Sequence, residues 1–136
     1  MEETLIRVTP DKTKAESIVK MAKVTVEMIK TIDVEKYTSN VVKEYYDVIR
    51  ELMSVILLLD GYKVYGEGAH KRIIEYIAKN CKQFSSAEIT LIDDLRTERH
   101  KISYDGFFVK PDYINVRKDG ISAVINKLES IIAKKM

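Results

Sequence analysis

The residues best suited to chemistry in this sequence gather between positions 96 and 104. This short stretch contains two arginines, a histidine, a serine and a tyrosine, namely Arg96, Arg99, His100, Ser103 and Tyr104. Guanidinium groups remain charged and bind phosphate or carboxylate oxygens, whereas an imidazole exchanges protons near neutral pH. The combination therefore predicts a site for an anionic group, with acid–base catalysis as an alternative use.

Arg99 is the residue of this group that an ordinary helical surface does not explain. Because residues of an α-helix advance by about 100° each, Arg99 falls in one arc with the apolar side chains of Leu91, Ile92, Leu95 and Ile102. A buried arginine cannot lose its proton, so it needs a carboxylate, a phosphate, several carbonyls or a water-filled cleft. Two interpretations stay open: Arg99 pairs with an acid of another helix and fixes the register, or it borders a ligand site.

The residues around Arg99 have interpretations of their own. Residues 96–101 read Arg-Thr-Glu-Arg-His-Lys, and such a run also forms solvated helix faces, on which Glu98 pairs locally. Arg96 and His100 are neighbours at helical spacing and can hold one phosphate together. His100 directly follows Arg99, so the two side chains diverge by about 100°.

Apolar periodicity predicts the helices that must position these residues. Thr9-Pro10 is typical of a helix start, and this first helix is expected to end near residue 32. Asp33 is expected to cap a second helix, which Asp60-Gly61 stops. Its last two turns are apolar on nearly all sides, which places them in the middle of the core.

Three further helices complete the expected fold. A glycine-containing loop over residues 61–69 precedes a short helix with Ile73, Ile74 and Ile77 on one face. The next helix begins with a capping box at residues 85–88 and ends at Asp105-Gly106. Pro111-Asp112 then opens the last helix. We therefore predict a single all-α domain over residues 1–136, an up-and-down bundle of about five helices.

Composition excludes several classes of function. The formal net charge is +2, which is too small to drive binding to nucleic acid without a local basic patch. The longest apolar stretch, residues 52–59, is far shorter than the roughly 20 residues of a membrane span. A single cysteine, Cys81, and an N-terminus without a secretory signal favour the cytoplasm. The two histidines lack metal-ligand spacing and no glycine-rich phosphate loop is present, so we expect neither a metal nor another cofactor.

Three segments together resemble the HEPN family, the domain named for higher-eukaryote and prokaryote nucleotide-binding proteins. The sequence from Tyr45 to Glu51 leads through an apolar helix end into Asp60-Gly61-Tyr62-Lys63, and Ala69-His70 opens the next helix. The segment from Arg99 to Tyr104 is similar to the family signature, an arginine, a polar residue and a histidine four to six residues further on. The resemblance covers roughly residues 11–133.

The resemblance implies an activity and matching residues. In nuclease members RNA is cleaved without metal; the arginine holds the phosphate, the histidine transfers protons and two domains pair around one cleft. Arg99 matches the family arginine and His100 the polar position, but Tyr104 stands where the histidine is expected. Since a tyrosine titrates near 10, about three units above an imidazole, this departure speaks against catalysis.

The leading hypothesis is a HEPN-like module that binds RNA or a nucleotide through Arg96, Arg99, Ser103 and Lys63. Lys63 joins this set if its loop, with Tyr62 and Tyr65, lies beside the arginines. We expect a homodimer, because the end of the second helix and Phe107-Phe108 offer much apolar surface. A nucleotidyltransferase-type partner follows from the resemblance. The alternatives are a metal-independent ribonuclease, the toxin of a toxin–antitoxin pair with Arg99, His100 and Tyr104 as catalytic residues, and a non-catalytic partner in which Arg99 only fixes the register.

Overall fold

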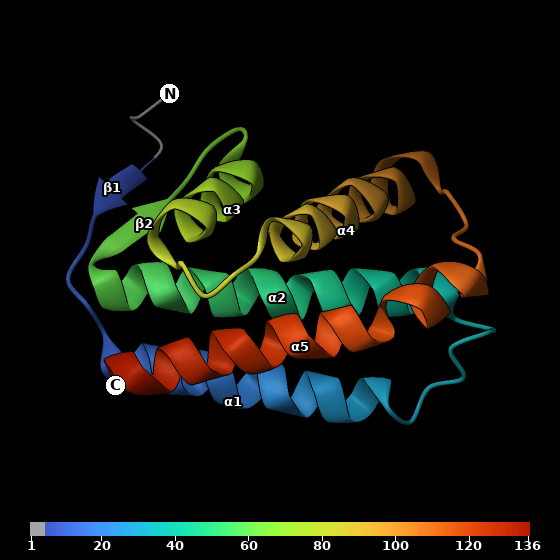
Figure 1. Ribbon diagram of the computed structural model, residues 1–136, viewed down its shortest axis with the longest axis horizontal. Coiled ribbons are helices and arrows are strands. Elements are labelled where there is room, and N and C mark those ends of the chain that lie inside the picture. The colour runs from blue at the N-terminus through green and yellow to red at the C-terminus, as the bar shows by residue number, and fades with distance from the viewer. Residues whose placement is uncertain (1–4) are drawn as a thin grey trace.

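The computed structural model describes residues 5–136, so the first four residues of the predicted domain lie outside it. Five helices and a two-stranded sheet make up the described chain, and the helical bundle predicted from the sequence is confirmed (Figure 1). The elements in chain order are β1 (Leu5–Arg7), α1 (Lys12–Ile29), α2 (Thr38–Asp60), β2 (Tyr62–Val64), α3 (Ala69–Asn80), α4 (Ser86–Asp105) and α5 (Pro111–Lys135).

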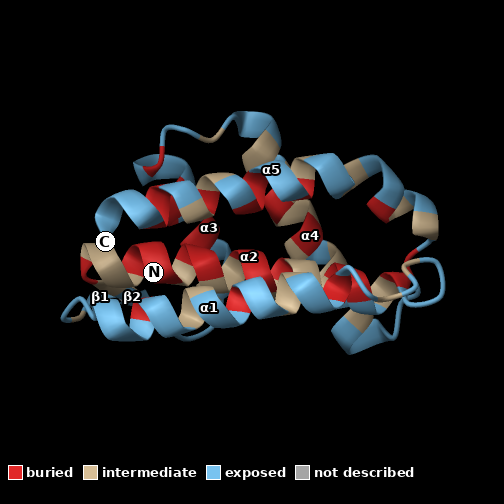
Figure 2. Ribbon diagram, turned by 90° about the horizontal axis from the view of Figure 1, so that it is seen from below, coloured by how far each residue is buried: buried red, intermediate tan, exposed pale blue. Residues whose placement is uncertain are grey.

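The long helix α2 is the centre of the bundle. The other four helices all pack against it, with α1 and α5 on one side and α3 and α4 on the other (Figure 1). Most of its buried side chains are aliphatic, and they form the red band that runs along α2 in Figure 2. The apolar end of α2 is covered within the chain itself, where Leu52, Ile56 and Leu57 are buried. That end therefore offers no free surface for a dimer, contrary to the sequence-based argument.

The first two helices begin later than the sequence pattern suggested. Asp11, rather than Thr9, caps α1, since its carboxylate accepts a hydrogen bond from the amide of Lys14 at 2.9 Å. Asp33 accepts from the amides of Glu35 and Lys36 and so forms a turn, and α2 begins only at Thr38. Both aspartate and threonine satisfy free amides in turns as well as at helix ends, which is why the pattern misplaced the starts.

A short strand of a two-stranded sheet occupies part of the segment predicted to be a loop. Strand β2 pairs antiparallel with β1, with Leu5 opposite Val64 and Arg7 opposite Tyr62. Gly61 ends α2 in the left-handed conformation, with φ of 88°, and its carbonyl accepts a hydrogen bond from the amide of Val8 at 2.9 Å. The β1 segment is too short for its alternation to be recognised in the sequence.

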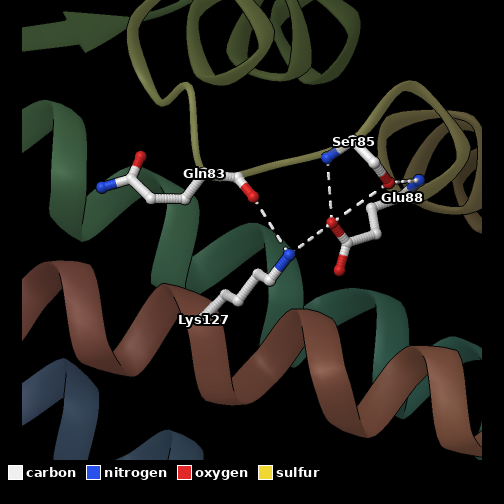
Figure 3. A network of polar contacts seen from close by, with 4 residues as sticks. All are labelled: Gln83, Ser85, Glu88 and Lys127. Carbon is white, nitrogen blue, oxygen red and sulfur yellow. Dashed lines mark hydrogen bonds and ion pairs between the residues drawn. The ribbon is translucent and has the colours of Figure 1, made fainter.

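The start of α4 is fixed by the predicted capping box and by α5. The hydroxyl of Ser85 accepts from the amide of Glu88 at 3.1 Å, and the carboxylate of Glu88 accepts from the amide of Ser85 at 2.9 Å. Lys127 of α5 donates to that carboxylate at 2.7 Å and to the carbonyl of Gln83 at 3.0 Å (Figure 3). These bonds, and the lysine first among them, hold the pKa of Glu88 below its usual value. The cap thereby anchors α4 on the bundle.

Among residues 5–136, no helix combines the length and the apolar character that crossing a bilayer requires.

Candidate anion-binding site

Arg99 is held from α2 by an acid. Its Nε atom donates to the Oδ1 atom of Asp47 at 2.8 Å, which joins the C-terminal half of α4 to the middle of α2. Both side chains keep 27% of their surface exposed, so this ion pair is not sealed in the core. The register interpretation and the site interpretation therefore both describe part of the geometry, because Asp47 binds one edge of the guanidinium and solvent reaches another.

The neighbours of Arg99 on α4 are arranged around it at helical spacing. Its Nη1 atom lies 3.4 Å from the hydroxyl of Ser103, one turn further along. Arg96, one turn earlier, donates through Nε to Asp93 at 2.8 Å. In both arginines the Nε edge is the one that contacts the carboxylate, which leaves the amino groups for further contacts.

A cavity of about 390 Å³ opens between α4 and the start of α3. It collects four of the residues predicted from the sequence, namely Arg96, Arg99, His100 and Tyr104, and adds Gly66, Gly68, Ala69, His70 and Lys71 from the loop and first turn of α3. No carboxylate occurs among the described residues that line it. The cavity therefore combines two guanidiniums, an ammonium and two imidazoles with no opposing charge in its wall.

The start of α3 gives this cavity backbone donors as well. Gly68 precedes the helix with φ of 77° and has no side chain that could cap it, and the first turn contains no acidic residue. Amides at a helix start have no partner within the helix and carry the positive end of its dipole. Helix starts of this kind bind phosphate and other anions. Groups on both helices, α3 and α4, thus attract an anion into the cavity.

His70 lies close enough to the arginines for their charge to lower the pKa of its imidazole. Its ring lies 5.9 Å from that of Tyr46, a buried side chain of α2. Partial burial, and then the guanidiniums of Arg50 and Arg99, hold the pKa of His70 below its ordinary value, although Asp47 opposes them. Burial also raises the pKa of Tyr46 to about 12. His70 is consequently a neutral imidazole near pH 7 in the unliganded chain.

A second cavity, of about 510 Å³, lies on the other side of the α3 start. It shares Ala69 and His70 with the first cavity. Its other lining residues come from β2, α1, α2, α3 and the segment after β1. Lys63, predicted to lie with the arginines of α4, lines this second cavity instead, together with Tyr62. Tyr65 is 51% exposed and lines neither cavity.

Four residues at or beside the two cavities were not recognised from the sequence, and one of them is Lys71 of α3, which lines the first cavity. Asp47 pairs with Arg99 across 52 positions, and no pattern in a single sequence reveals such a contact. His70 was interpreted as a surface or capping residue of the helix start, and it does lie there, but it also lines both cavities. Arg50 lies one turn after Asp47 on α2, and its Nε atom is buried without a hydrogen-bond partner among residues 5–136. An arginine on the buried stripe of α2 was the available signal for it.

Comparison of this chain with protein-family models, with curated proteins and with solved structures finds no match. The fold and site define an α-helical bundle with a cationic cavity between two of its helices.

Proposed function

We propose that this chain is a HEPN-like helical module that binds single-stranded RNA, with a phosphate of the RNA in the cavity between α3 and α4. The observation that carries the proposal is the charge of the cavity wall. Arg96 and Arg99 approach from α4, His70 and Lys71 from α3, and no carboxylate lies among the described lining residues. The singly charged phosphodiester group of an RNA strand supplies the negative charge that this wall lacks.

The arginine geometry suits a phosphate better than a point-like anion. Asp47 contacts the Nε atom of Arg99 and fixes the orientation of the guanidinium plane. A guanidinium held at one edge presents parallel N–H donors at another, and such a fork matches the spacing of phosphate oxygens. The pairing with Asp47 then positions Arg99 for a ligand instead of competing with it.

The aromatic ring at the cavity edge suits a ligand that carries a base beside its phosphate, as RNA does. Tyr104 is 75% exposed, and its ring lies 4.5 Å from that of His100. An exposed aromatic ring beside a phosphate site offers a face on which an unpaired base stacks.

Metal-independent RNA cleavage is the second candidate function, and the two imidazoles favour it. His70 and His100 come from different helices and line one cavity with Arg99. A neutral imidazole is a suitable general base at pH 7, and the lowered pKa of His70 keeps it in that form. Tyr104 occupies the position of the family histidine, so His70 would take over proton transfer, in the manner of a toxin of a toxin–antitoxin pair.

The partners remain part of the proposal. A homodimer is now argued from Phe107 and Phe108, which follow α4 with 44% and 86% of their surface exposed. Pairing through these rings would bring two α4 ends, and so two cationic cavities, to one side of the dimer. A nucleotidyltransferase-type partner rests on the family resemblance alone.

Binding of fluorescein-labelled oligouridylate, measured by anisotropy in the presence of a chelator, tests the proposed function. We expect Arg99→Met to weaken binding about tenfold and to lower the slope of log affinity against log salt by about one. Arg117→Met is the matched control, because Arg117 also pairs with an aspartate, Asp94 at 3.3 Å, but lines neither cavity. This control should bind like the unmodified chain.

The outcomes separate the candidate functions. Shortening of the oligonucleotide under chelator, lost in Arg99→Met and in His70→Gln, would establish the ribonuclease. Unchanged binding in Arg99→Met, with equal or greater stability to urea, would identify the arginine as a register device. Failure to bind either oligouridylate or inorganic phosphate would contradict an anion site altogether.

A further inference from the structure

The second cavity has the chemistry of a base-binding site. Its floor is apolar, formed by Val8, Ile18, Leu57, Leu58, Val64 and Ile73. Around that floor stand three cationic side chains, Lys14, Arg50 and Lys63, and the phenol of Tyr62. Flat aromatic ligands with polar edges fit such a lining, since the ring faces contact aliphatic groups while the edge atoms meet the donors.

Arg50 is the strongest sign that this cavity takes a ligand. Its Nε atom is buried and has no hydrogen-bond partner among residues 5–136. A buried N–H of a charged group that lacks an acceptor is costly, and native structures rarely retain one without a reason. Arg50 also lines the cavity, so a ligand with acceptor atoms at the wall would meet the charge of its guanidinium.

The two cavities are neighbours at the start of α3. Ala69 and His70 line both of them, with His70 from the first turn of the helix. Within a nucleotide the base and the phosphate are separated by the width of one ribose. We therefore place the phosphate in the first cavity and the attached base in the second, which leaves Lys14 and Lys63 of the second cavity for the next phosphate.

We propose that the cavity between the two-stranded sheet, α1 and α2 binds an unpaired guanine of the RNA. The phosphate of that RNA lies between α3 and α4. This inference rests on the proposed function. Guanine is selected because O6 and N7 are adjacent acceptors, which arginine and lysine recognise. Adenine presents a donor at that edge, and the acid in the cavity, Asp11, is already engaged as the cap of α1.

Two octaribonucleotides test the base site, UUUGUUUU and the same chain with an abasic ribose in place of the guanosine. The abasic oligonucleotide is expected to bind about tenfold more weakly to the unmodified protein. Arg50→Met should remove this difference by weakening the guanosine oligonucleotide alone. Arg72→Met is the matched control, since Arg72 lies on α3 and lines neither cavity; it should keep the full difference.

A cavity-filling variant guards against loss of the fold. Ser54 is half-buried on α2 and lines the second cavity, so Ser54→Met narrows the site while retaining Arg50. It should abolish the preference for guanosine just as Arg50→Met does. Equal binding of the two oligonucleotides by the unmodified protein would overturn the base site and leave the phosphate site standing. If neither oligonucleotide binds, the proposed function fails and the base site fails with it.

Discussion

Arg99 is bound by an acid and yet faces a cavity, and this double contact is the chemical basis of the site. A buried ion pair alone contributes little to stability and is often replaceable by apolar side chains. Here the pair is only partly covered, with 27% of each side chain exposed. Asp47 thus holds the guanidinium in place without neutralising the whole cavity, because Arg96 and Lys71 line it as well.

His70 should make binding depend on pH. In the free chain its pKa lies below the ordinary value, because of burial and the nearby guanidiniums of Arg50 and Arg99. A phosphate placed beside it favours the imidazolium and raises that pKa, so binding takes up a proton. The affinity for oligouridylate should therefore rise as the pH falls through the ordinary histidine range near 6.5, by up to about tenfold per pH unit.

His70→Gln separates this effect from that of the other histidine. His100 of α4 lines the same cavity, and the sequence contains two histidines in all. Titrations by anisotropy at a series of pH values should show a much flatter profile in His70→Gln than in His100→Gln. A full pH dependence in His70→Gln would rule out His70 as the group that takes up the proton.

At the level of the elements, the cap of α4 sets where the arginines lie. The Ser85 hydroxyl and the Glu88 carboxylate satisfy each other's amides, and Lys127 ties the pair to α5. Since α4 carries Arg96 and Arg99 in its later turns, its position on α2 is fixed at one end by this network and at the other by Asp47. Loss of the cap should therefore weaken the helix before it disturbs the site.

Ser85→Ala measures this contribution. Replacing a capping serine by alanine costs about 1 kcal/mol, so we expect the free energy of unfolding in urea to fall by about that amount. Ser86→Ala is the control, because Ser86 is an exposed residue of the first turn and does not cap the helix. Equal stabilities of the two variants would show that the capping box does not anchor α4.

Most of the helical elements could be predicted because their signals are local. The capping box at Ser85, the glycine after Asp60 and the proline at residue 111 each mark a boundary that the structure contains. The two-stranded sheet could not be predicted, because β1 spans three residues and is stable only through its pairing with β2, far away in the sequence. Local patterns contain no information about such pairing.

The candidate site shows the same division between local and distant information. Four of the predicted residues share one helix, so helical spacing alone places them close together, and all four line the cavity: Arg96, Arg99, His100 and Tyr104. Asp47 and His70 reach the site from α2 and α3, and their placement depends on how the helices pack. Lys63 was included on the condition that its loop lies beside the arginines, but as part of β2 it lines the neighbouring cavity.

For the whole molecule, the bundle divides into a supporting half and a half that carries the candidate site. The helices α1 and α5 cover one side of α2 and contribute much of the core, whereas α3 and α4 cover the other side and enclose the cationic cavity (Figure 1). A net charge of only +2 means that attraction for RNA depends on this one face and not on the molecule as a whole. The proposal therefore predicts that RNA contacts the face formed by α3 and α4.

Mapping the amide resonances of the isotope-labelled protein while oligouridylate is added tests that location most directly. The largest shifts are expected at His70 and Lys71 of α3 and from Arg96 to Tyr104 of α4, while α1 and α5 stay unchanged. Inorganic phosphate should shift the same amides over a smaller range. Shifts centred on another face would contradict the account. So would the absence of shifts at an oligouridylate concentration that saturates the anisotropy signal.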